Sequence, residues 1–274
     1  MSPPHSIRLP GPGIVLDAVP LTPEAFAPFG DVVENPRPGL HPSSADKQPS
    51  SLPFSAVTAN QGSAIKYQHV SRQINLYDQA PSGRPGSALM SMFVCAARAR
   101  IPDPHLASAP IPGRNPSSTF PITVLERHPF TTQTFIPLAA DPTAHYLVLV
   151  APSLPPPLEA DEAAAAAAAF PVPSALPPSS AGYPRPLPGG GMPDARRIRA
   201  FVANAAQAVT YGAGTWHAPM VALGEKGTAI DFVVVQFANG VGVEDCQEVY
   251  LEGGVSARLS PLKEKGKERR LARL

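Results

Sequence analysis

The apolar and polar residues of this chain follow the short periods of β-strands along most of its length. Alternating or continuous apolar stretches are bounded by Pro, Gly and Asn, which is the signature of strands separated by turns. The predicted strands lie in 14–18, 62–70, 88–99, 122–128, 132–138, 144–151, 198–223 and 229–239. Many short strands with turn signals between them predict a mainly β sandwich or small barrel.

Helical signals are few. Thr22 is a suitable N-cap, Pro23 stands at the first helical position and Glu24 falls in the first turn, so one short helix is expected after the first strand. The 37 prolines concentrate in particular stretches and mark places where regular structure stops. We therefore predict long loops at 36–53 and 102–121.

The chain is expected to form one domain with three irregular parts. Residues 1–13 are rich in Pro and Gly and are predicted to be a disordered N-terminal arm, residues 14–260 a single domain, and residues 261–274 a basic tail. Residues 151–193 combine many prolines with seven alanines at 163–169. We interpret them as a surface insertion with one or two exposed helical turns and assign no chemistry to them.

Composition narrows the class of ligand. The 274 residues carry a formal net charge of +1 and only 16% are charged, which gives no basic surface for nucleic acid or for an anionic membrane. No apolar run is long enough to span a bilayer, and the first residues do not resemble a secretory signal. Cys95 and Cys246 are interpreted as reduced packing residues. A cytoplasmic protein with a small-molecule ligand is expected.

The segment 210–220 (TYGAGTWHAPM) is the first candidate for chemistry. Gly212 and Gly214 allow a sharp turn that fixes the directions of Trp216 and His217. A histidine beside an aromatic wall can exchange protons near neutral pH. Taken alone, His217 is more often a hydrogen-bonded structural residue.

A second candidate lies in 124–138 (VLERHPFTTQTFIPL). Glu126 and His128 are two apart on a predicted strand, so their side chains share a face and could bind a metal or transfer protons. Gln133 would return on the neighbouring strand with an amide group. A solvated strand face explains the same spacing equally well. Lys66 could be a counter-charge for a carboxylate, although most lysines are solvated, and Glu244, Asp245 and Glu248 most simply form a polar loop.

Taken together, these segments resemble the ureidoglycolate lyases, especially the fungal ones. The resemblance rests on LTPEAFAPFGDVVE, NQGSAIKYQHVS, VLERHPFTTQTFIPL, YLVLVAP, MPDARRIRAFVANAAQAVTYGAGTWHAPMVALG, DFVVVQFANG and EDCQEVY, about half of the chain. YGAGT followed by WHAPM is its most specific part. The chain departs from the family pattern in three ways. It carries the insertion at 151–193, and Val94 occupies the neighbourhood in which relatives tend to place an arginine. Ala218 stands in place of a second histidine.

The resemblance implies a cupin-like β-barrel (double-stranded jelly roll), usually a homodimer, that cleaves ureidoglycolate to glyoxylate and urea in allantoin and purine degradation. The cupin metal positions correspond to Glu126, His128, Gln133 and His217. With Gln133 where a metal-binding cupin carries Glu, no cofactor is expected to be required, and a divalent metal would bind loosely.

The reaction needs two proton-transfer groups and one carboxylate anchor. We expect His217 as the leading acid or base with Glu126 or His128 as its partner. Lys66 would hold the carboxylate, Gln133 the ureido group, and Trp216 and Tyr211 would line the substrate. A ureidoglycolate amidohydrolase and a non-catalytic cupin that binds a small acid are the alternatives.

The C-terminal tripeptide Ala272, Arg273 and Leu274 is similar to the small-basic-leucine address read by the peroxisomal import receptor. The basic residues before it suit an exposed tail. Cytoplasm and peroxisome are therefore the two expected locations.

Overall fold

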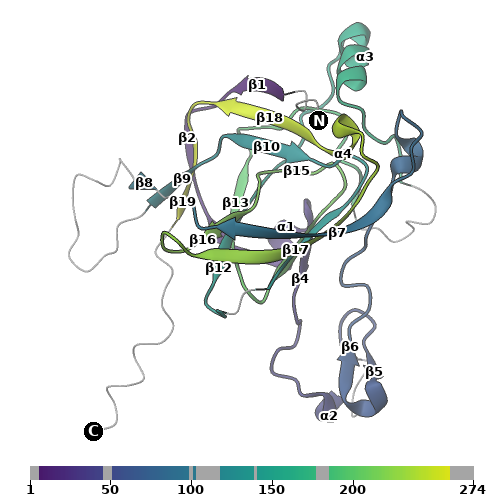
Figure 1. Ribbon diagram of the computed structural model, residues 1–274, viewed down its shortest axis with the longest axis vertical. Helices are drawn as coiled ribbons and strands as arrows, with labels where there is room; N and C mark the ends of the chain where they lie inside the picture. Colours follow the sequence, from purple (N-terminus) through teal and green to yellow (C-terminus); the bar gives the residue numbers. More distant parts are fainter. Residues whose placement is uncertain are drawn as a thin grey trace.

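The computed structural model describes residues 6–45, 51–98, 101–102, 118–138, 141–176 and 185–259. This part of the chain is mainly β with a few short helices, as predicted. Its sheets pack against one another to form the body of the molecule. One hairpin and one helix project from this body (Figure 1). None of the helices described is both long and apolar enough to cross a membrane.

The strands form four sheets. The eight-stranded sheet has the order β1 (Ser6–Pro10), β18 (Gln247–Glu252), β10 (Val124–Arg127), β15 (Trp216–His217), β12 (His145–Ala151), β13 (Arg199–Asn204) and β3 (Val19–Pro20), with β16 (Val221–Leu223) also paired to β12. The five-stranded sheet has the order β4 (Gly30–Val33), β14 (Ala208–Tyr211), β11 (Gln133–Pro137), β17 (Ala229–Ala238) and β7 (Ser87–Ala96).

The two smaller sheets and the helices complete the fold. The four-stranded sheet has the order β2 (Ile14–Asp17), β19 (Val255–Leu259), β9 (Ser118–Pro121) and β8 (Ile101–Pro102), and the two-stranded sheet pairs β5 (Val57–Ala59) with β6 (Ala64–Lys66). The α-helices are α1 (Pro23–Phe26), α2 (Pro42–Ala45), α3 (Ala160–Ala169) and α4 (Gly242–Asp245), and the 3₁₀ helices are η2 (Asn60–Gly62) and η3 (Tyr77–Gln79).

The eight-stranded sheet is the middle layer of the molecule, and β12 shows why. Successive side chains of a strand point to opposite faces. Tyr146 and Val148 enter one core together with Phe232 of the five-stranded sheet. Leu147 and Leu149 enter a second core, which the four-stranded sheet covers. Both faces of β12 are therefore buried, which explains its continuous apolar sequence.

The chain crosses between the two large sheets at two neighbouring corners. Residues 128–132 lead from β10 in the eight-stranded sheet to β11 in the five-stranded sheet, and residues 212–215 lead from β14 back to β15. Gly214 has a φ of +77°, which favours glycine, and its N–H donates to the His128 carbonyl at 2.9 Å. This bond ties the corners together beside the two candidate histidines.

Several local predictions are confirmed. The backbone N–H of Ala25 donates to the Thr22 hydroxyl at 3.2 Å, so Thr22 caps α1, which begins at Pro23. Strands occupy the predicted segments around residues 122–128, 132–138, 144–151 and 229–239. Neither Cys95 nor Cys246 forms a disulfide.

Other local predictions are wrong. Residues 6–10 of the N-terminal arm form β1, which pairs in parallel with β18, because the free edge of the eight-stranded sheet accepts another strand whatever its Pro content. Within the predicted strand 62–70 only Ala64–Lys66 is extended in a ladder. Strand β9 falls inside the predicted loop 102–121. Residues 1–5 and the tail 261–274 with its tripeptide lie outside the described residues.

The Pro/Ala-rich segment 151–193 packs more closely than a surface insertion would. Its alanine run forms α3, which projects outward as expected but is longer than two turns (Figure 1). Ser153 and Pro193 form an isolated β-bridge at the base of the segment, and the Arg185 side chain is buried. The segment is therefore only in part the surface insertion that was predicted.

Candidate active site

The strand pair β10 and β15 brings Glu126 and His217 together. The two residues are directly opposite each other in the antiparallel ladder, and Nε2 of His217 lies 3.6 Å from Oε1 of Glu126. The His128 ring follows on the same face, with its centroid 5.5 Å from that of His217. Possible ligand atoms of these three residues all lie within 4.8 Å of one another. We call Glu126, His128 and His217 the catalytic cluster.

His217 is buried and held on three sides. Its Nδ1 lies 2.9 Å from the Thr215 carbonyl, which can only accept, so Nδ1 carries a proton. The Tyr211 ring stacks on the imidazole with centroids 4.0 Å apart and an interplanar angle of 13°. Nε2 then carries the lone pair and lies 3.1 Å from the Gln133 amide oxygen and 3.6 Å from the Glu126 carboxyl group, of which only the acid form can donate to it. Nε2 is therefore the nitrogen that can exchange a proton with a ligand.

His128 has the same orientation but leaves one nitrogen without a partner. Its Nδ1 lies 2.6 Å from the Asp245 carbonyl and so carries the proton. Its Nε2 is buried and makes no hydrogen bond to any described residue. A buried polar atom without a partner costs free energy, and such atoms mark places where a ligand or ion completes the site.

Burial sets the pKa values of the cluster. It raises the pKa of Glu126 to about 7, and the neighbouring Glu248 carboxylate adds to the effect. Burial also lowers the pKa of His217, with a further contribution from His128, and lowers the pKa of His128 itself. At neutral pH both imidazoles are therefore uncharged, while Glu126 is divided between its acid and carboxylate forms.

The donor set fits a divalent metal ion. Each imidazole donates Nδ1–H to a backbone carbonyl and turns the Nε2 lone pair toward the other members of the cluster, as metal-binding histidines commonly do. The carboxylate of Glu126 supplies a third donor. Gln133 donates its amide N–H to Gln236 at 2.7 Å and directs its oxygen to His217, so this oxygen could serve as a weak fourth ligand.

Trp216 is not part of this cluster, contrary to the sequence prediction. It precedes His217 on the same strand and so points to the opposite face, where it packs in the core beneath the four-stranded sheet. Its indole N–H donates to the Gly191 carbonyl at 3.0 Å, and the Arg127 guanidinium lies 4.4 Å from its ring. Trp216 therefore has a structural role as a core residue.

Lys66 is also not brought to the cluster. It lies at the end of β6, in the two-stranded sheet that projects from the body of the molecule (Figure 1), and it is exposed. Its strand pairs only with β5 in the described residues and joins neither large sheet, so Lys66 does not meet the cluster of its own chain and its role as carboxylate anchor stays a prediction. Gln133 and Tyr211, in contrast, both lie against His217 as expected.

Two residues beside the cluster were not assigned to it from the sequence. Glu248, predicted in a polar loop, lies on β18 opposite Glu126. Cys246 places its Sγ 4.0 Å from Oε2 of Glu126. Gln247 and Glu248 are adjacent polar residues, so the sequence of 246–251 has no clear polar–apolar alternation that would have placed Glu248 and Cys246 beside Glu126.

Comparisons with known proteins show the family of the chain. The family model described as ureidoglycolate lyase matches residues 14–258. Among curated proteins, the ureidoglycolate lyase of Schizosaccharomyces pombe is 35% identical over 229 residues, which cover 83% of this chain and 86% of that protein. The ureidoglycolate lyase of Saccharomyces cerevisiae is 31% identical over 247 residues (88% and 97%), and that of Burkholderia mallei is 30% identical over 220 residues (80% and 81%). The chain belongs to the ureidoglycolate lyase family.

Proposed function

We propose that this protein cleaves ureidoglycolate to glyoxylate and urea at the catalytic cluster. The observation that carries the proposal is the convergence of Glu126 and His217 at 3.6 Å, with the unpartnered Nε2 of His128 beside them, in a chain matched by the family model over residues 14–258. The cluster combines a carboxyl group that titrates near neutral pH with two neutral imidazoles.

The chemistry that this reaction requires is modest. One carbon of ureidoglycolate bears a hydroxyl, a carboxylate and a urea nitrogen. A base removes the hydroxyl proton, the carbon–oxygen double bond of glyoxylate forms as the carbon–nitrogen bond breaks, and the departing nitrogen receives a proton to give urea. The proton count balances without a redox step or a covalent intermediate.

Glu126 is the group best suited to move the proton. A proton-transfer group is most effective when its pKa is close to the operating pH, and burial brings the pKa of Glu126 to about 7. Its carboxylate takes the hydroxyl proton, and the Glu126–His217 pair returns a proton to the urea nitrogen. His217 was the leading acid or base expected from the sequence; its lowered pKa makes it the partner of Glu126 instead.

The remaining members of the site bind and orient the substrate. The free Nε2 of His128 accepts a hydrogen bond from a substrate hydroxyl or N–H group, and the Gln133 amide contacts the ureido group. The reaction requires no cofactor in this proposal. A divalent ion held loosely by Glu126, His128 and His217 would supply positive charge for the substrate carboxylate.

Product analysis tests this proposal directly. Purified protein incubated with ureidoglycolate should release urea and glyoxylate in equal amounts, and a chelator should leave most of the turnover in place. Release of ammonia would indicate the amidohydrolase alternative, and stoichiometric binding without turnover would indicate a non-catalytic small-acid-binding protein. Loss of all turnover with the chelator, restored by a divalent ion, would show that the metal is required.

We further propose that the two large sheets form a cupin-like jelly roll. Residues from both sheets share one core, in which Val150 and Phe201 of the eight-stranded sheet meet Phe135 and Val234 of the five-stranded sheet. The corners at 128–132 and 212–215 are the sheet-to-sheet connections that such a fold uses. An experimental structure with the catalytic cluster inside a barrel would support the assignment, and one with open, separate sheets would contradict it.

We also propose that the protein is a homodimer that pairs through β7. This strand lies at the edge of the five-stranded sheet (Figure 1). Its apolar side chains are exposed on both faces, with Met90 75% and Val94 70% exposed on one face and Leu89 45% exposed on the other. A long apolar edge strand is normally covered. Sedimentation should give a dimer for the natural chain and a monomer for Met90→Asp; a natural monomer would contradict the proposal.

The location of the protein is proposed to be the cytoplasm or the peroxisome. The tripeptide Ala272, Arg273 and Leu274 is the sequence feature that favours the import receptor as a partner. A fluorescent protein fused ahead of the last twelve residues should collect in peroxisomes if the tripeptide is read. A diffuse signal that does not change when the tripeptide is deleted would indicate that the protein is located in the cytoplasm.

A further inference from the structure

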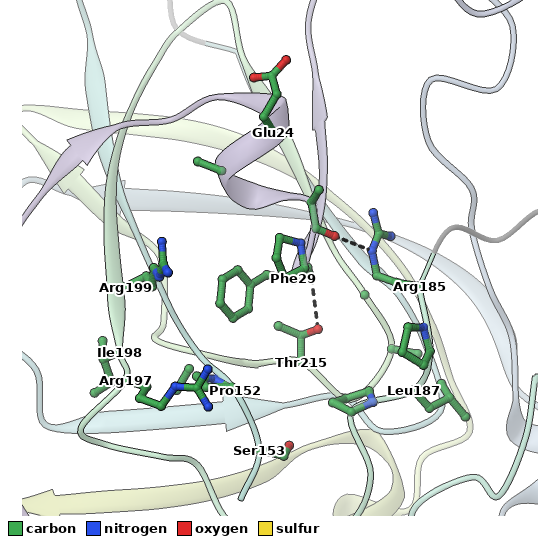
Figure 2. A pocket seen from close by; sticks show the side chains of 18 residues that line it. Glu24, Phe29, Pro152, Ser153, Arg185, Leu187, Arg197, Ile198, Arg199 and Thr215 are labelled. Carbon is green, nitrogen blue, oxygen red and sulfur yellow. Dashed lines mark hydrogen bonds between the residues drawn. The ribbon is translucent and has the colours of Figure 1, made fainter.

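A second site lies outside the catalytic cluster. A cavity of about 880 Å³ opens between α1, the end of β12, the segment around Arg185 and the start of β13 (Figure 2). None of the residues of the catalytic cluster lines it. Its volume is within the range of pockets for organic ligands, and it is much larger than one small acid requires.

The walls of the cavity are largely apolar. Phe29 and Leu187 lie on different sides of it, and Ile198 and several prolines complete the lining (Figure 2). These side chains come from segments far apart in the sequence, including residues 185–188 of the Pro-rich segment, which close one side. Such a surface favours a ligand with an apolar or aromatic body.

Two arginines give the cavity a positive charge. Arg197 and Arg199 are two residues apart, line the cavity and are exposed. Neither guanidinium makes an ion pair or hydrogen bond with any residue in the described ranges. Among the described residues, Glu24 is the one acidic residue of the lining. An arginine binds carboxylate and phosphate groups with two parallel hydrogen bonds, so the pair suits an anionic group.

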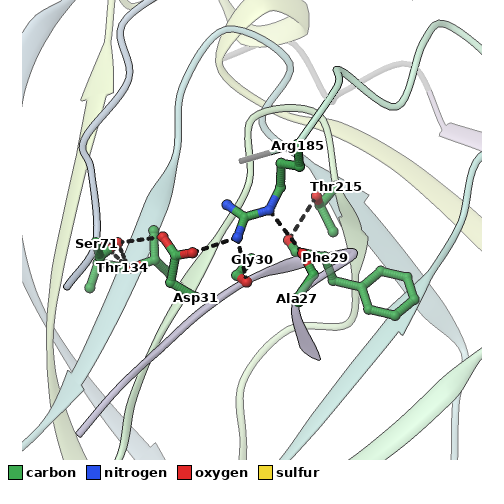
Figure 3. Close-up of polar contacts among 9 residues, drawn as sticks. Ala27, Phe29, Gly30, Asp31, Ser71, Thr134, Arg185 and Thr215 are labelled. Atoms are coloured by element: carbon green, nitrogen blue, oxygen red, sulfur yellow. Dashed lines mark hydrogen bonds and ion pairs between the residues drawn. The ribbon is translucent and has the colours of Figure 1, made fainter. Parts of the chain in front are cut away.

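Arg185, unlike these two arginines, has a structural role. Its guanidinium donates to the Ala27 carbonyl at 3.0 Å and to the Gly30 carbonyl at 2.7 Å, and it forms an ion pair with Asp31 (Figure 3). Its charge is thus already matched. These bonds fix the Pro-rich wall of the cavity to the end of α1 and to β4, so the cavity exists before any ligand binds.

We propose that this cavity binds an organic anion with an apolar or aromatic body and one carboxylate or phosphate group. The anionic group lies at Arg197 and Arg199, and the apolar body lies against Phe29 and Leu187. Ser153, on the same lining, has a hydroxyl without a hydrogen-bond partner among the described residues and adds a polar contact on rotation about χ1. This site is separate from the proposed lyase chemistry and does not depend on it.

The cavity adjoins the catalytic region at Thr215, and this contact limits where the ligand can act. Thr215 lines the cavity, donates its hydroxyl to the Phe29 carbonyl at 3.0 Å and accepts Nδ1–H of His217 through its own carbonyl. The wall between the two sites is therefore the backbone of 212–215. The ligand lies behind this wall and does not compete for the cluster itself.

The test measures binding of 8-anilinonaphthalene-1-sulfonate, an aromatic anion, to the full chain by fluorescence titration. We expect one probe per chain in the natural protein and at least tenfold weaker binding in the double variant Arg197→Ala, Arg199→Ala. Arg196→Ala is the matched control, because this neighbouring exposed arginine does not line the cavity. The uncharged N-phenyl-1-naphthylamine should bind at least tenfold more weakly than the anion.

Absence of saturable binding to the natural protein would overturn the proposal. Equal affinity of the double variant and the natural protein, or equal affinity for the charged and uncharged probes, would overturn it as well. Thermal unfolding of each variant confirms that the fold is intact, and all three arginines are exposed, so their removal leaves the core unchanged. Competition by aromatic carboxylates against aromatic phosphates then identifies the preferred anionic group. Because the measurement detects binding alone, its failure leaves the lyase proposal standing.

Discussion

Two faces of the same strand pair have opposite character in this protein. On one face of β10 and β15, Glu126 and His217 belong to the catalytic cluster; on the other, Arg127 and Trp216 form a closed structural unit. The Arg127 guanidinium is fully buried and donates to the Gln247 side chain and to the carbonyls of residues 189–191. The two groups are adjacent in sequence and are separated only by the alternation of the strand.

The difference lies in how completely the polar groups are satisfied. Arg127 is surrounded by acceptors, and burial lowers its pKa to about 9, which still leaves it charged at neutral pH. On the cluster face, the Nε2 of His128 has no partner within the described ranges, and Glu126 is shifted to a pKa of about 7. Unmet hydrogen bonds and a titrating carboxyl group are features of a binding or catalytic site, whereas a saturated arginine is a feature of the core.

The largest expected effect is on turnover and comes from the cluster face. His217→Asn should lower kcat by about 10² to 10⁴, because Nε2 is lost while the amide nitrogen can still donate to the Thr215 carbonyl. Steady-state kinetics on the folded variant, checked by circular dichroism, give the value. Near-natural kcat would show that His217 is one more structural histidine.

The second effect is on stability and comes from the opposite face. Arg127→Met should lower the free energy of unfolding by about 2 to 4 kcal/mol, because the carbonyls of 189–191 and the Gln247 amide lose their donor inside the core. Urea denaturation measures the change. The folded Arg127→Met protein should keep kcat within a few-fold of the natural value. A loss of kcat as large as that of His217→Asn would show that the two faces are not functionally separate.

Part of this contrast could be predicted from the sequence. Glu126 and His128 are two apart on a strand and do share a face. The same rule places Trp216 opposite His217, but the Gly-rich segment before them suggested a sharp turn that fixes both directions, and Trp216 was expected to line the substrate. Lys66 could not be placed, because pairing between strands distant in sequence is decided by the tertiary fold. Arg185 was missed because Pro and Ala around it indicate surface structure, although the wall it holds is packed.

A smaller effect concerns the stability cost of the cluster. The folded state raises the pKa of Glu126 from 4.5 to about 7, so the stabilisation from its protonated form is complete below pH 4.5 and is lost as the pH rises through 7. Glu126→Gln should therefore exceed the natural protein in free energy of unfolding by about 1 to 3 kcal/mol at pH 8. Thermal or urea unfolding at pH 8 and at pH 4.5 should show the gain only at the higher pH; a gain of equal size at both would contradict the burial argument.

The smallest effect is expected at Lys66. Because it is exposed on the projecting hairpin, Lys66→Ala should leave KM and kcat within about two-fold of the natural values. Initial-rate kinetics over a range of ureidoglycolate concentrations decide the matter. A KM raised tenfold would mean that the hairpin of another subunit reaches the cluster and would reinstate Lys66 as the carboxylate anchor.

The most direct test of the central claim is the pH dependence of kcat/KM for the natural protein and for Glu126→Gln. In the natural protein kcat/KM should rise with pH and level off above a pKa near 7, as the Glu126 carboxyl loses its proton. The variant should be at least 10²-fold slower and should lack this titration. A variant that keeps both the rate and the same pH dependence would show that the proton is moved elsewhere.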